Sequence, residues 1–529
     1  MSGIQKILFG FVAILVATIA GAGSTVGAIS SNPKTFISAD NTFYAYVESG
    51  EKVTINFTKV GKVGSAEIHD EPVTVLIDAP GVKQTICDIA ANVPDGQGCN
   101  FSDMVAESDG VWRITFKLPE NAHVHNGVVS SVKWGSNHFS WAVTVSDAVG
   151  EKKGRLWTEL YAIVQPGPRE YLADQTFYYQ SEDGYLYRVI YKGYNGQIST
   201  LSADAFGIVK KGTCTPAYRS ISASTATAVP SFGSCGGSYK LFFEQPSDDL
   251  PADATRWDGE KEWIRPAIDR PVVEELSFTP DQNKSAQSGE IKYKLKNFIG
   301  QYEVRIDTNN DGNYDGPDDV IIRKQIKNLK TAEQKVKFDG SDKSGKTISR
   351  SQHIKIKIRI SKAAEIHLVG SDIEGREGGI ELVRLSGDNA PSSNIYWDDT
   401  ELDPVAGSLD KDLKLEGLEG PESIGGVHPW KYSTNEVLTW GNARYIDDWT
   451  YATTRVSGVA EIEYPSGEVI TEQVAQRNMG IGLLVAVIIV VIIAAGGTFY
   501  GVKRHRRKEL NAFLPTNTNV NNDDFPPKV

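Results

Sequence analysis

Residues 42–57 read TFYAYVESGEKVTINF, a pattern that is typical of two β-strands joined by a turn. Aromatic and β-branched residues occupy alternate positions on both sides of Ser49 and Gly50. A period of two puts the apolar residues on one face of each strand, where they can be buried. Short runs of the same kind recur up to residue 150, so the sequence predicts a β-sandwich (jelly-roll or Ig-like) domain over residues 33–150.

Three further segments carry the same kind of pattern. A Tyr-rich β domain is expected over residues 151–267, an Ig-like β domain over 268–395, and a Trp-rich membrane-proximal β/loop domain over 396–475. The chain has 50 glycines, 21 tyrosines and only 3 methionines, which suits strands and turns better than helices. The expected fold class is therefore mainly β, with several β-sandwich or Ig-like domains in tandem.

An uncharged apolar run occupies residues 479–502 and reads MGIGLLVAVIIVVIIAAGGTFYGV. A run of this length is long enough to cross a bilayer as a helix. A cluster of Lys and Arg follows between positions 503 and 508, and such a cluster marks the cytoplasmic side of a span. The sequence thus predicts one C-terminal transmembrane helix over residues 479–502 and a cytoplasmic tail over residues 503–529.

The N-terminus carries the features of an export signal. Lys6 precedes an apolar stretch, and Val26-Gly27-Ala28 offers the small residues of a cleavage site. This pattern predicts a signal peptide over residues 1–28, and an uncleaved signal anchor is the alternative. In both cases we expect a single-pass plasma-membrane protein with residues 29 to about 475 outside the cell.

Four cysteines, Cys87, Cys99, Cys214 and Cys235, lie in the segment that is expected outside the cell. An even number there predicts disulfides, for which three pairings are possible. Pairing between sequence neighbours, Cys87–Cys99 and Cys214–Cys235, is favoured because each pair brackets a turn-rich loop. The formal net charge of −12 includes no basic stripe outside the tail, which argues against a nucleic-acid partner.

The sharpest local motif is an Asp/Asn-rich loop over residues 307–318. Calcium prefers oxygen ligands on a tightly turning loop, and Gly312 stands sixth, where the turn is sharpest. The candidate calcium ligands are Asp307, Asn309, Asp311, Asn313 through its carbonyl, Asp315 and Asp318. The flanks resemble strands rather than the helices of an EF-hand, so a bound Ca²⁺ would be structural. The alternative is an acidic loop that is held by Asx turns and binds no metal.

Tyr185, Tyr187 and Tyr191 share a parity and should lie on one face of a sheet. If this face is exposed, the three rings form a candidate binding surface. The alternative is a half-buried sheet in which the rings pack in the core and the hydroxyls reach towards solvent.

Two pairs of neighbouring carboxylates stand near the end of the exported segment, at residues 398–399 and 447–448. Adjacent residues in a strand point to opposite faces, so neither pair is expected to act as an acid/base dyad. The sequence contains no recognisable catalytic motif, and we therefore do not expect an enzyme.

Several strings resemble the repeated ectodomains of large actinobacterial-type (Gram-positive) cell-surface proteins of the adhesin kind. They are GRLWTELY, FYYQSEDGYLYRVIYKGYNG, SADAFG, DTNNDGNYDG, EIHLVGSDIEGREGGIELVRLSGDNAPSSNIYWDDTEL, GGVHPW and WGNARYIDDWTY. In addition, EIKYKL followed by FDGSDKSGK and HIKIKIRI is similar to an Ig-like module of the flagellar-hook-cap type. The resemblance implies envelope localisation and a display or attachment role, and it brings no catalytic residues.

The expected function is that of a membrane-anchored adhesin or surface-display protein, whose partner is another cell surface or an envelope polymer. Two alternatives come from other classes: an envelope carbohydrate-active enzyme, and a viral spike or fusion glycoprotein. The sequons at Asn56, Asn100 and Asn283 would matter in a source that glycosylates such sites.

Overall fold

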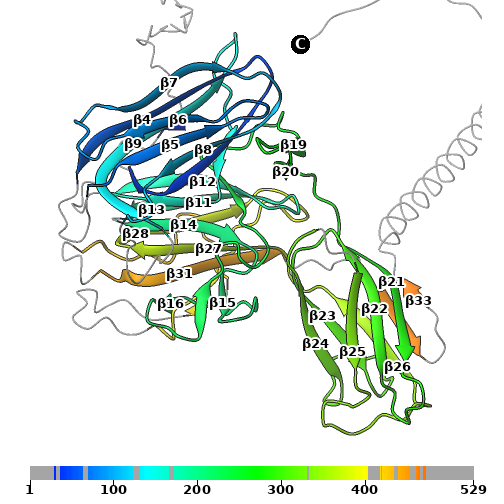
Figure 1. The fold of residues 1–529 in the computed structure, drawn as a ribbon. Helices are drawn as coiled ribbons and strands as arrows, with labels where there is room; N and C mark the ends of the chain where they lie inside the picture. The colour runs from blue at the N-terminus through cyan, green and yellow to red at the C-terminus, as the bar shows by residue number, and fades with distance from the viewer. Residues whose placement is uncertain are drawn as a thin grey trace, which may run out of the picture. The chain divides into compact units, whose positions relative to one another are not determined.

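The structure, a computed structural model, consists of strands, turns and loops (Figure 1). It describes residues 29–30, 36–62, 70–122, 132–165, 172–196, 198–329, 333–402, 417–418, 420–433, 439–452, 460–464 and 469–471. No helix occurs among these residues, and the predicted mainly β class is confirmed. The predicted signal peptide, transmembrane helix and cytoplasmic tail lie outside them. Within the described residues, no helix is long and apolar enough to cross a membrane.

The chain divides into two compact units, residues 1–469 and 470–529. The first unit holds nearly all of the described residues, and every sheet described below belongs to it. A short strand, β33 (Val469–Thr471), spans the division.

One sheet, called the outer sheet here, has the strand order β1–β9–β4–β7, with β2 also paired to β9. Its strands are β1 (Ile29–Ser30), β2 (Ile37–Ala39), β4 (Lys52–Lys62), β7 (Gly98–Val105) and β9 (Trp134–Ser146). The alternation in β4 buries Val53, Ile55 and Phe57, because these residues share the face that packs on the core. The neighbouring strands pair antiparallel throughout.

The largest sheet joins strands from three of the predicted domains. Its order is β28 (Gly375–Arg384), β13 (Leu186–Asn195), β12 (Ala173–Gln180), β18 (Lys240–Phe242), β10 (Leu156–Thr158), β3 (Asn41–Val47), β8 (Gly110–Lys117), β5 (Val73–Asp78) and β6 (Thr85–Ile89). The expected domain boundary between residues 150 and 151 therefore does not separate two domains. β10 pairs with β3, so the sheet continues across it.

A third sheet has the strand order β11–β14–β27–β31–β16. Its strands are β11 (Leu160–Ile163), β14 (Ser199–Asp204), β16 (Ile221–Ser222), β27 (Ala363–Ile373) and β31 (Gly441–Ala452). Three two-stranded ribbons accompany it: β15 (Ile208–Lys210) with β17 (Ala228–Pro230), β19 (Asp253–Thr255) with β20 (Lys261–Trp263), and β29 (Trp397–Asp398) with β30 (Gly417–Leu418). The strands β27, β28 and β31 thus belong with the Tyr-rich segment rather than with the predicted domains at 268–395 and 396–475.

The aromatic cluster around Trp141 shows how closely these parts share a core. The Trp141 ring on β9 lies 4.5 Å from Phe43 on β3 and 4.9 Å from Phe243, which follows β18. Its indole N–H donates to the Tyr161 hydroxyl on β11 at 3.1 Å. The four rings come from both sides of residue 150. The predicted domains at 33–150 and 151–267 are therefore not expected to fold separately.

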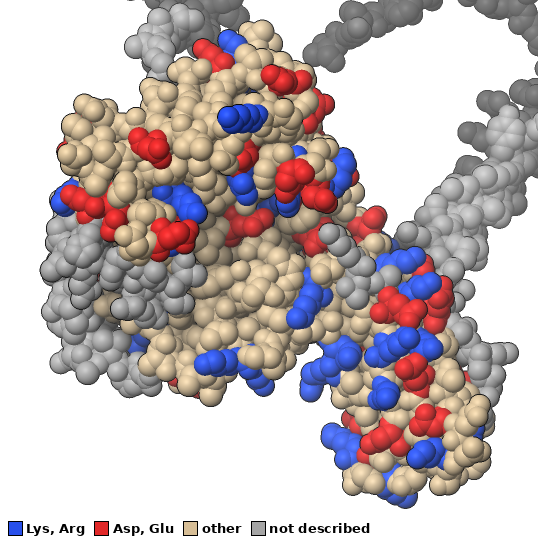
Figure 2. Space-filling view, viewed as in Figure 1, with Lys and Arg blue, Asp and Glu red and all other residues tan. Residues whose placement is uncertain are grey.

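The segment that was predicted as an Ig-like domain forms two sheets around a hydrophobic core of its own, and it is called the Ig-like module here after that prediction. One sheet has the order β21–β22–β25, and the other contains β24, β23, β26 and β32 in that order. The strands are β21 (Val272–Pro280), β22 (Gly289–Lys296), β23 (Gly300–Asp307), β24 (Val320–Ile326), β25 (Glu333–Phe338), β26 (Ile354–Arg359) and β32 (Ala460–Tyr464). Apolar side chains such as Tyr293 and Val304 face inward, while Lys, Arg, Asp and Glu intersperse on its surface (Figure 2). The module therefore ends at residue 360 and takes its closing strand from residues 460–464.

Both predicted disulfides are confirmed, as Cys87–Cys99 and Cys214–Cys235. Cys87 lies on β6 and Cys99 on β7, which are the terminal strands of two different sheets. This disulfide therefore ties the two sheets together at an edge, where no strand-to-strand hydrogen bonds would hold them.

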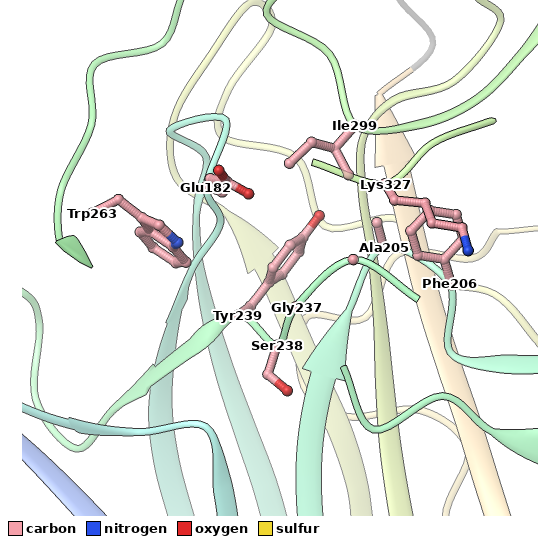
Figure 3. A pocket seen from close by; sticks show the side chains of 10 residues that line it. Glu182, Ala205, Phe206, Gly237, Ser238, Tyr239, Trp263, Ile299 and Lys327 are labelled. Atoms are coloured by element: carbon pink, nitrogen blue, oxygen red, sulfur yellow. The ribbon is translucent and has the colours of Figure 1, made fainter. Parts of the chain in front are cut away.

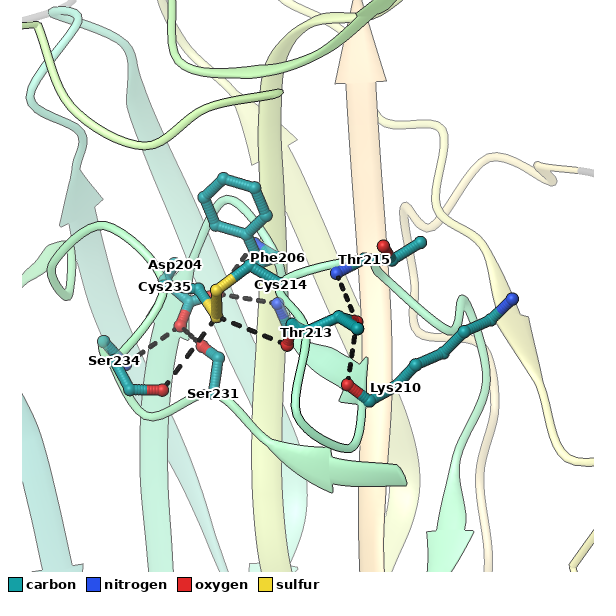
Figure 4. Close-up of a disulfide and its surroundings, with 11 residues drawn as sticks. Asp204, Phe206, Lys210, Thr213, Cys214, Thr215, Ser231, Ser234 and Cys235 are labelled. Carbon is teal, nitrogen blue, oxygen red and sulfur yellow. Dashed lines mark hydrogen bonds between the residues drawn. A yellow bond between two sulfur atoms is a disulfide. The ribbon is translucent and has the colours of Figure 1, made fainter. Parts of the chain in front are cut away.

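The second disulfide stands beside a turn that Asp204 organises (Figure 4). The carboxylate of Asp204 accepts the backbone N–H groups of Phe206 at 2.8 Å and Gly207 at 2.6 Å. It also accepts the hydroxyl of Ser231 and the N–H of Gly233. A carboxylate that receives several N–H groups can stay buried, and here it ties the turn before β15 to the segment that leads to Cys235.

Candidate functional site

The neighbouring carboxylates Asp447 and Asp448 on β31 point to opposite faces of the sheet, as the alternation predicted. Each of them nevertheless meets a buried histidine. Asp447 contacts His367 on β27, and Asp448 contacts His428. Two separate ionic clusters, named here after their histidines, therefore lie on the two sides of one strand.

The His428 cluster consists of His428, Asp448, Asp399 and Arg376, all of them buried. The imidazole nitrogens lie 2.7 Å from Asp448 and 2.8 Å from Asp399. Arg376 donates to Asp448 at 2.6 Å and to the backbone carbonyl of His428. Two carboxylates and two cations therefore neutralise one another, which buried charges require.

Tryptophan rings enclose the His428 cluster. Trp397 stacks on the imidazole with centroids 4.5 Å apart and planes 3° apart. The guanidinium of Arg376 lies 4.3 Å over the Trp430 ring. His428 itself has φ of 54°, a conformation that non-glycine residues seldom adopt. The cluster therefore fixes a backbone that is otherwise unfavourable, and it joins segments near residues 376, 399, 428 and 448.

Electrostatics favour the charged form of both partners. Burial opposes the charge on His428, but Asp448 and Asp399 outweigh it and raise the pKa of the imidazole above its usual 6.5. Burial also opposes the charge on Asp448, yet Arg376 and His428 hold the pKa of this carboxyl at about 2. The imidazolium and the carboxylate thus coexist over a wide pH range.

In the His367 cluster, too, a buried histidine lies between two carboxylates, but the partners differ. The imidazole lies 2.9 Å from Asp447, and its other nitrogen lies 3.6 Å from Glu365. The Tyr218 hydroxyl donates to Glu365 at 2.6 Å. Burial opposes the charge on His367, but Asp447 and Glu365 outweigh it and raise the pKa to about 10. This histidine is therefore protonated at neutral pH.

Stability is expected to fall in the alkaline range because of these histidines. The folded-state pKa of His428 exceeds the unfolded value of 6.5, so its contribution is complete below pH 6.5 and is lost as the pH rises through the raised pKa. We expect the difference in Tm between the wild type and His428→Gln to be largest at acidic and neutral pH. The difference should shrink as the pH rises through the raised pKa of His428. Thermal unfolding across this range, followed by tryptophan fluorescence, measures the difference.

The control for this prediction is His353→Gln. His353 is exposed and pairs with Glu463 at 2.9 Å. Its replacement should change Tm little at any pH, because exposed ion pairs contribute at most about 1 kcal/mol. If the difference in Tm between the wild type and His428→Gln stays constant with pH, His428 is not charged in the folded state.

The histidines and carboxylates of both clusters are buried. A small cavity beside Tyr239 has a volume of about 20 Å³ and admits about one water molecule (Figure 3). Glu182, Phe206, Trp263 and Lys327 are among its lining residues. A cavity of this size is too small for a substrate.

A larger groove, of about 750 Å³, opens in the Ig-like module. It runs between the edge strand β24 and the ends of β21, β22 and β25. Its apolar lining includes Val320, Ile322 and Phe338, and its charged lining consists of Asp281, Glu290, Lys337 and Asp339. Volumes of this size are common for ligand pockets, although the lining here mixes both signs of charge.

The Asp/Asn-rich loop follows β23 and turns at Gly312, whose φ of 82° suits glycine. Asp307 is fully buried, and it accepts the N–H groups of Gly312 at 2.8 Å and Asp311 at 3.3 Å. Asn309, Asp311 and Asn313 lie on the exposed turn. Burial is the main cause that raises the pKa of Asp307, and Asp319 adds to it.

The remaining two candidate ligands, Asp315 and Asp318, have other surroundings. Asp315 pairs with Arg305 and lies 3.6 Å from Arg359, and Asp318 is exposed. Asp319, which was not predicted, is buried and accepts the N–H groups of Thr308 at 3.1 Å and Gly316 at 2.7 Å. Hairpin register could have revealed it, because Ile306 pairs with Val320 and so Asp319 stands opposite Asp307.

Among the described residues, no three His, Cys, Asp or Glu side chains are grouped as metal ligands. Calcium binding by the loop stays a prediction. The candidate binding surface of Tyr185, Tyr187 and Tyr191 needs a correction, because all three rings are buried. Tyr187 donates to the carbonyl of Ala364 at 2.7 Å, so β27 covers this face, and the alternative in which the rings pack in the core applies.

The sequence analysis missed His367, Arg376 and His428, because nothing local marks them. His367 lies 80 residues from Asp447, and Arg376 lies 72 residues from Asp448. Comparison of the chain with models of protein families, with curated proteins and with solved structures found no match.

Proposed function

We propose that the chain is a membrane-anchored cell-surface protein that binds another cell or an envelope polymer, as an adhesin or a display protein. The observation that carries the proposal is the pair of disulfides, which takes up all four cysteines of the chain. Disulfides of this kind form and persist in oxidising compartments outside the cytoplasm. The apolar run at 479–502 with its basic flank is the anchor in this proposal.

The sheet architecture supports a binding role rather than catalysis. The neighbouring carboxylates Asp447 and Asp448 are each neutralised by buried partners. The Ig-like module has a solvated, charged surface and a groove, both of which suit contact with another molecule (Figure 2).

Protease treatment of intact cells tests the topology. We expect external protease to remove residues up to about 475 and to leave a C-terminal stub that contains the anchor and tail. Cells whose membranes are opened first serve as the control. Protection of the large segment in intact cells would overturn the proposal.

Binding of the purified full chain to intact candidate cells and to envelope polymers tests the role. Retention on one of them supports the proposal. Hydrolysis of a glycan library by the same preparation would favour an envelope carbohydrate-active enzyme instead.

Calcium is part of the proposal, as a structural ion in the loop after β23. Two carboxylates near each other, Asp307 and Asp319, repel one another when both are charged, and a divalent cation relieves this repulsion. Calcium at about 100 times its Kd would stabilise the fold by about 2.7 kcal/mol, and Tm should rise accordingly. Differential scanning fluorimetry with Ca²⁺ against excess chelator measures the effect.

Two variants decide which acidic residue takes part. Asp319→Asn should abolish the calcium-dependent rise in Tm, whereas Asp318→Asn, on an exposed neighbour, should keep it. The opposite result would support the ligand set expected from loop spacing. An unchanged Tm of the wild type with Ca²⁺ would mean that the loop is held by its Asx turns alone.

A further inference from the structure

The centre of the outer face of the outer sheet carries small uncharged side chains, although 23% of the residues of the chain are charged. In β4 the residues that alternate with the buried ones are Thr54, Asn56 and Thr58, preceded by Lys52, which pairs with Asp103 at the end of the face. In β9 the corresponding residues are Ser140, Ala142 and Thr144. These residues lie opposite one another in the ladder, so they form a flat, small and uncharged polar surface across two strands.

The edge strand β7 extends this surface with a second asparagine. Asn100 stands directly opposite Asn56 in the β4–β7 ladder. Cys99 points inward and is tied to Cys87, so the next residue, Asn100, points outward and is exposed. Both asparagines begin an N-x-S/T sequon, with Thr58 and Ser102 as the hydroxyl residues.

We propose that Asn100 is the acceptor of an asparagine-linked glycan, and that this glycan covers the uncharged outer face of β4, β7 and β9 (Figure 1). The inference rests on the proposed function, because a glycan donor acts on exported chains. In the transfer, the carboxamide nitrogen of Asn100 bonds to the anomeric carbon of the first sugar. The bond from that carbon to the phosphate oxygen of a lipid-linked oligosaccharide breaks. The lipid phosphate leaves with the bonding electrons, and one amide proton is released.

Geometry selects Asn100 over Asn56. Side chains that stand opposite each other in a ladder have Cβ atoms only about 4.5–5.5 Å apart, so two glycans would collide. Asn56 lies on an interior strand, is half-buried, and accepts the Thr58 hydroxyl at 2.5 Å. Asn100 and Ser102 are both exposed on the last strand of the sheet.

A glycan at this position also has a physical role. The terminal strand of a sheet carries unpaired N–H and C=O groups that can pair with another chain. On β7 and the neighbouring β6, Val105 and Ile86 are each 57% exposed, which adds apolar surface at this edge. A bulky hydrophilic group on Asn100 blocks such pairing sterically.

Mass spectrometry of the full chain, purified from its native cells, tests the proposal. We expect the proteolytic peptide with Asn100 to carry a glycan mass and the peptide with Asn56 to carry none. Ser102→Ala should remove the modification, and Ser102→Thr should retain it. Ser140→Ala, on the same face but outside both sequons, is the matched control and should leave it unchanged.

The outcomes separate this inference from the proposed function. If external protease cleaves the chain on intact cells but Asn100 is unmodified, the glycan inference fails while the surface location stands. A glycan at Asn283, which is also exposed, together with a bare Asn100 would overturn the assignment too, because the donor had then reached the chain. If external protease does not reach the chain, the proposed function itself fails.

Discussion

Replacing Asp448 with asparagine is expected to lower the free energy of unfolding by about 3–5 kcal/mol. Asp448 accepts hydrogen bonds from Arg376 at 2.6 Å and from His428 at 2.7 Å. A neutral amide would leave Asp399 as the single carboxylate of the His428 cluster beside two buried cations. Denaturant-induced unfolding of the purified chain, followed by tryptophan fluorescence, measures the loss.

The matched control is another carboxylate-to-amide change, Glu333→Gln. Glu333 pairs with Lys335 at 3.3 Å on β25, and both side chains are exposed. Exposed pairs of this kind contribute about 0–1 kcal/mol, so this variant should remain close to the wild type. An equally small effect of Asp448→Asn would show that the His428 cluster is not a charged, buried network.

Replacing Trp141 with alanine is expected to cost about 3–5 kcal/mol and to destabilise residues on both sides of position 150. The ring fills the space between Phe43, Tyr161 and Phe243, and its N–H donates to the Tyr161 hydroxyl. Removal leaves a cavity and an unpaired buried hydroxyl. Pulse proteolysis with identification of the cleavage sites measures the loss on each side.

Val149→Ala is the control, since Val149 is 96% exposed and its truncation should change stability by less than about 0.5 kcal/mol. If Trp141→Ala makes only residues 36–150 sensitive to protease, the first and second segments are separate domains, as the sequence alone suggested. Cleavage that increases equally beyond residue 151 supports the shared core.

Local patterns were sufficient for much of the fold. The alternation in TFYAYVESGEKVTINF was confirmed as β3 and β4, which a turn at residues 49–50 separates. The disulfide pairing also followed from local turns. These features depend on contacts between residues near in the chain, so a single sequence contains enough information for them.

The candidate sites were predictable only in part, because partners distant in the chain decide them. The Asp/Asn-rich loop is where the motif put it, but the hairpin register presents Asp319, not Asp318, to Asp307. Tyr185, Tyr187 and Tyr191 have the periodicity of a sheet face, and period alone does not tell which layer covers that face. Here β27 supplies the Ala364 carbonyl to Tyr187, and the face is buried.

Local sequence patterns specify the β class, the turns, the cysteine pairs and the position of the acidic loop. The tertiary structure alone decided that one sheet crosses residue 150, that residues 460–464 close the Ig-like module, and that Asp447 and Asp448 each meet a buried histidine. The reason is physical: a period of two specifies which side of a strand is apolar, but not which strand lies beside it. Strand order is set by packing and charge neutralisation between segments that are remote in the chain.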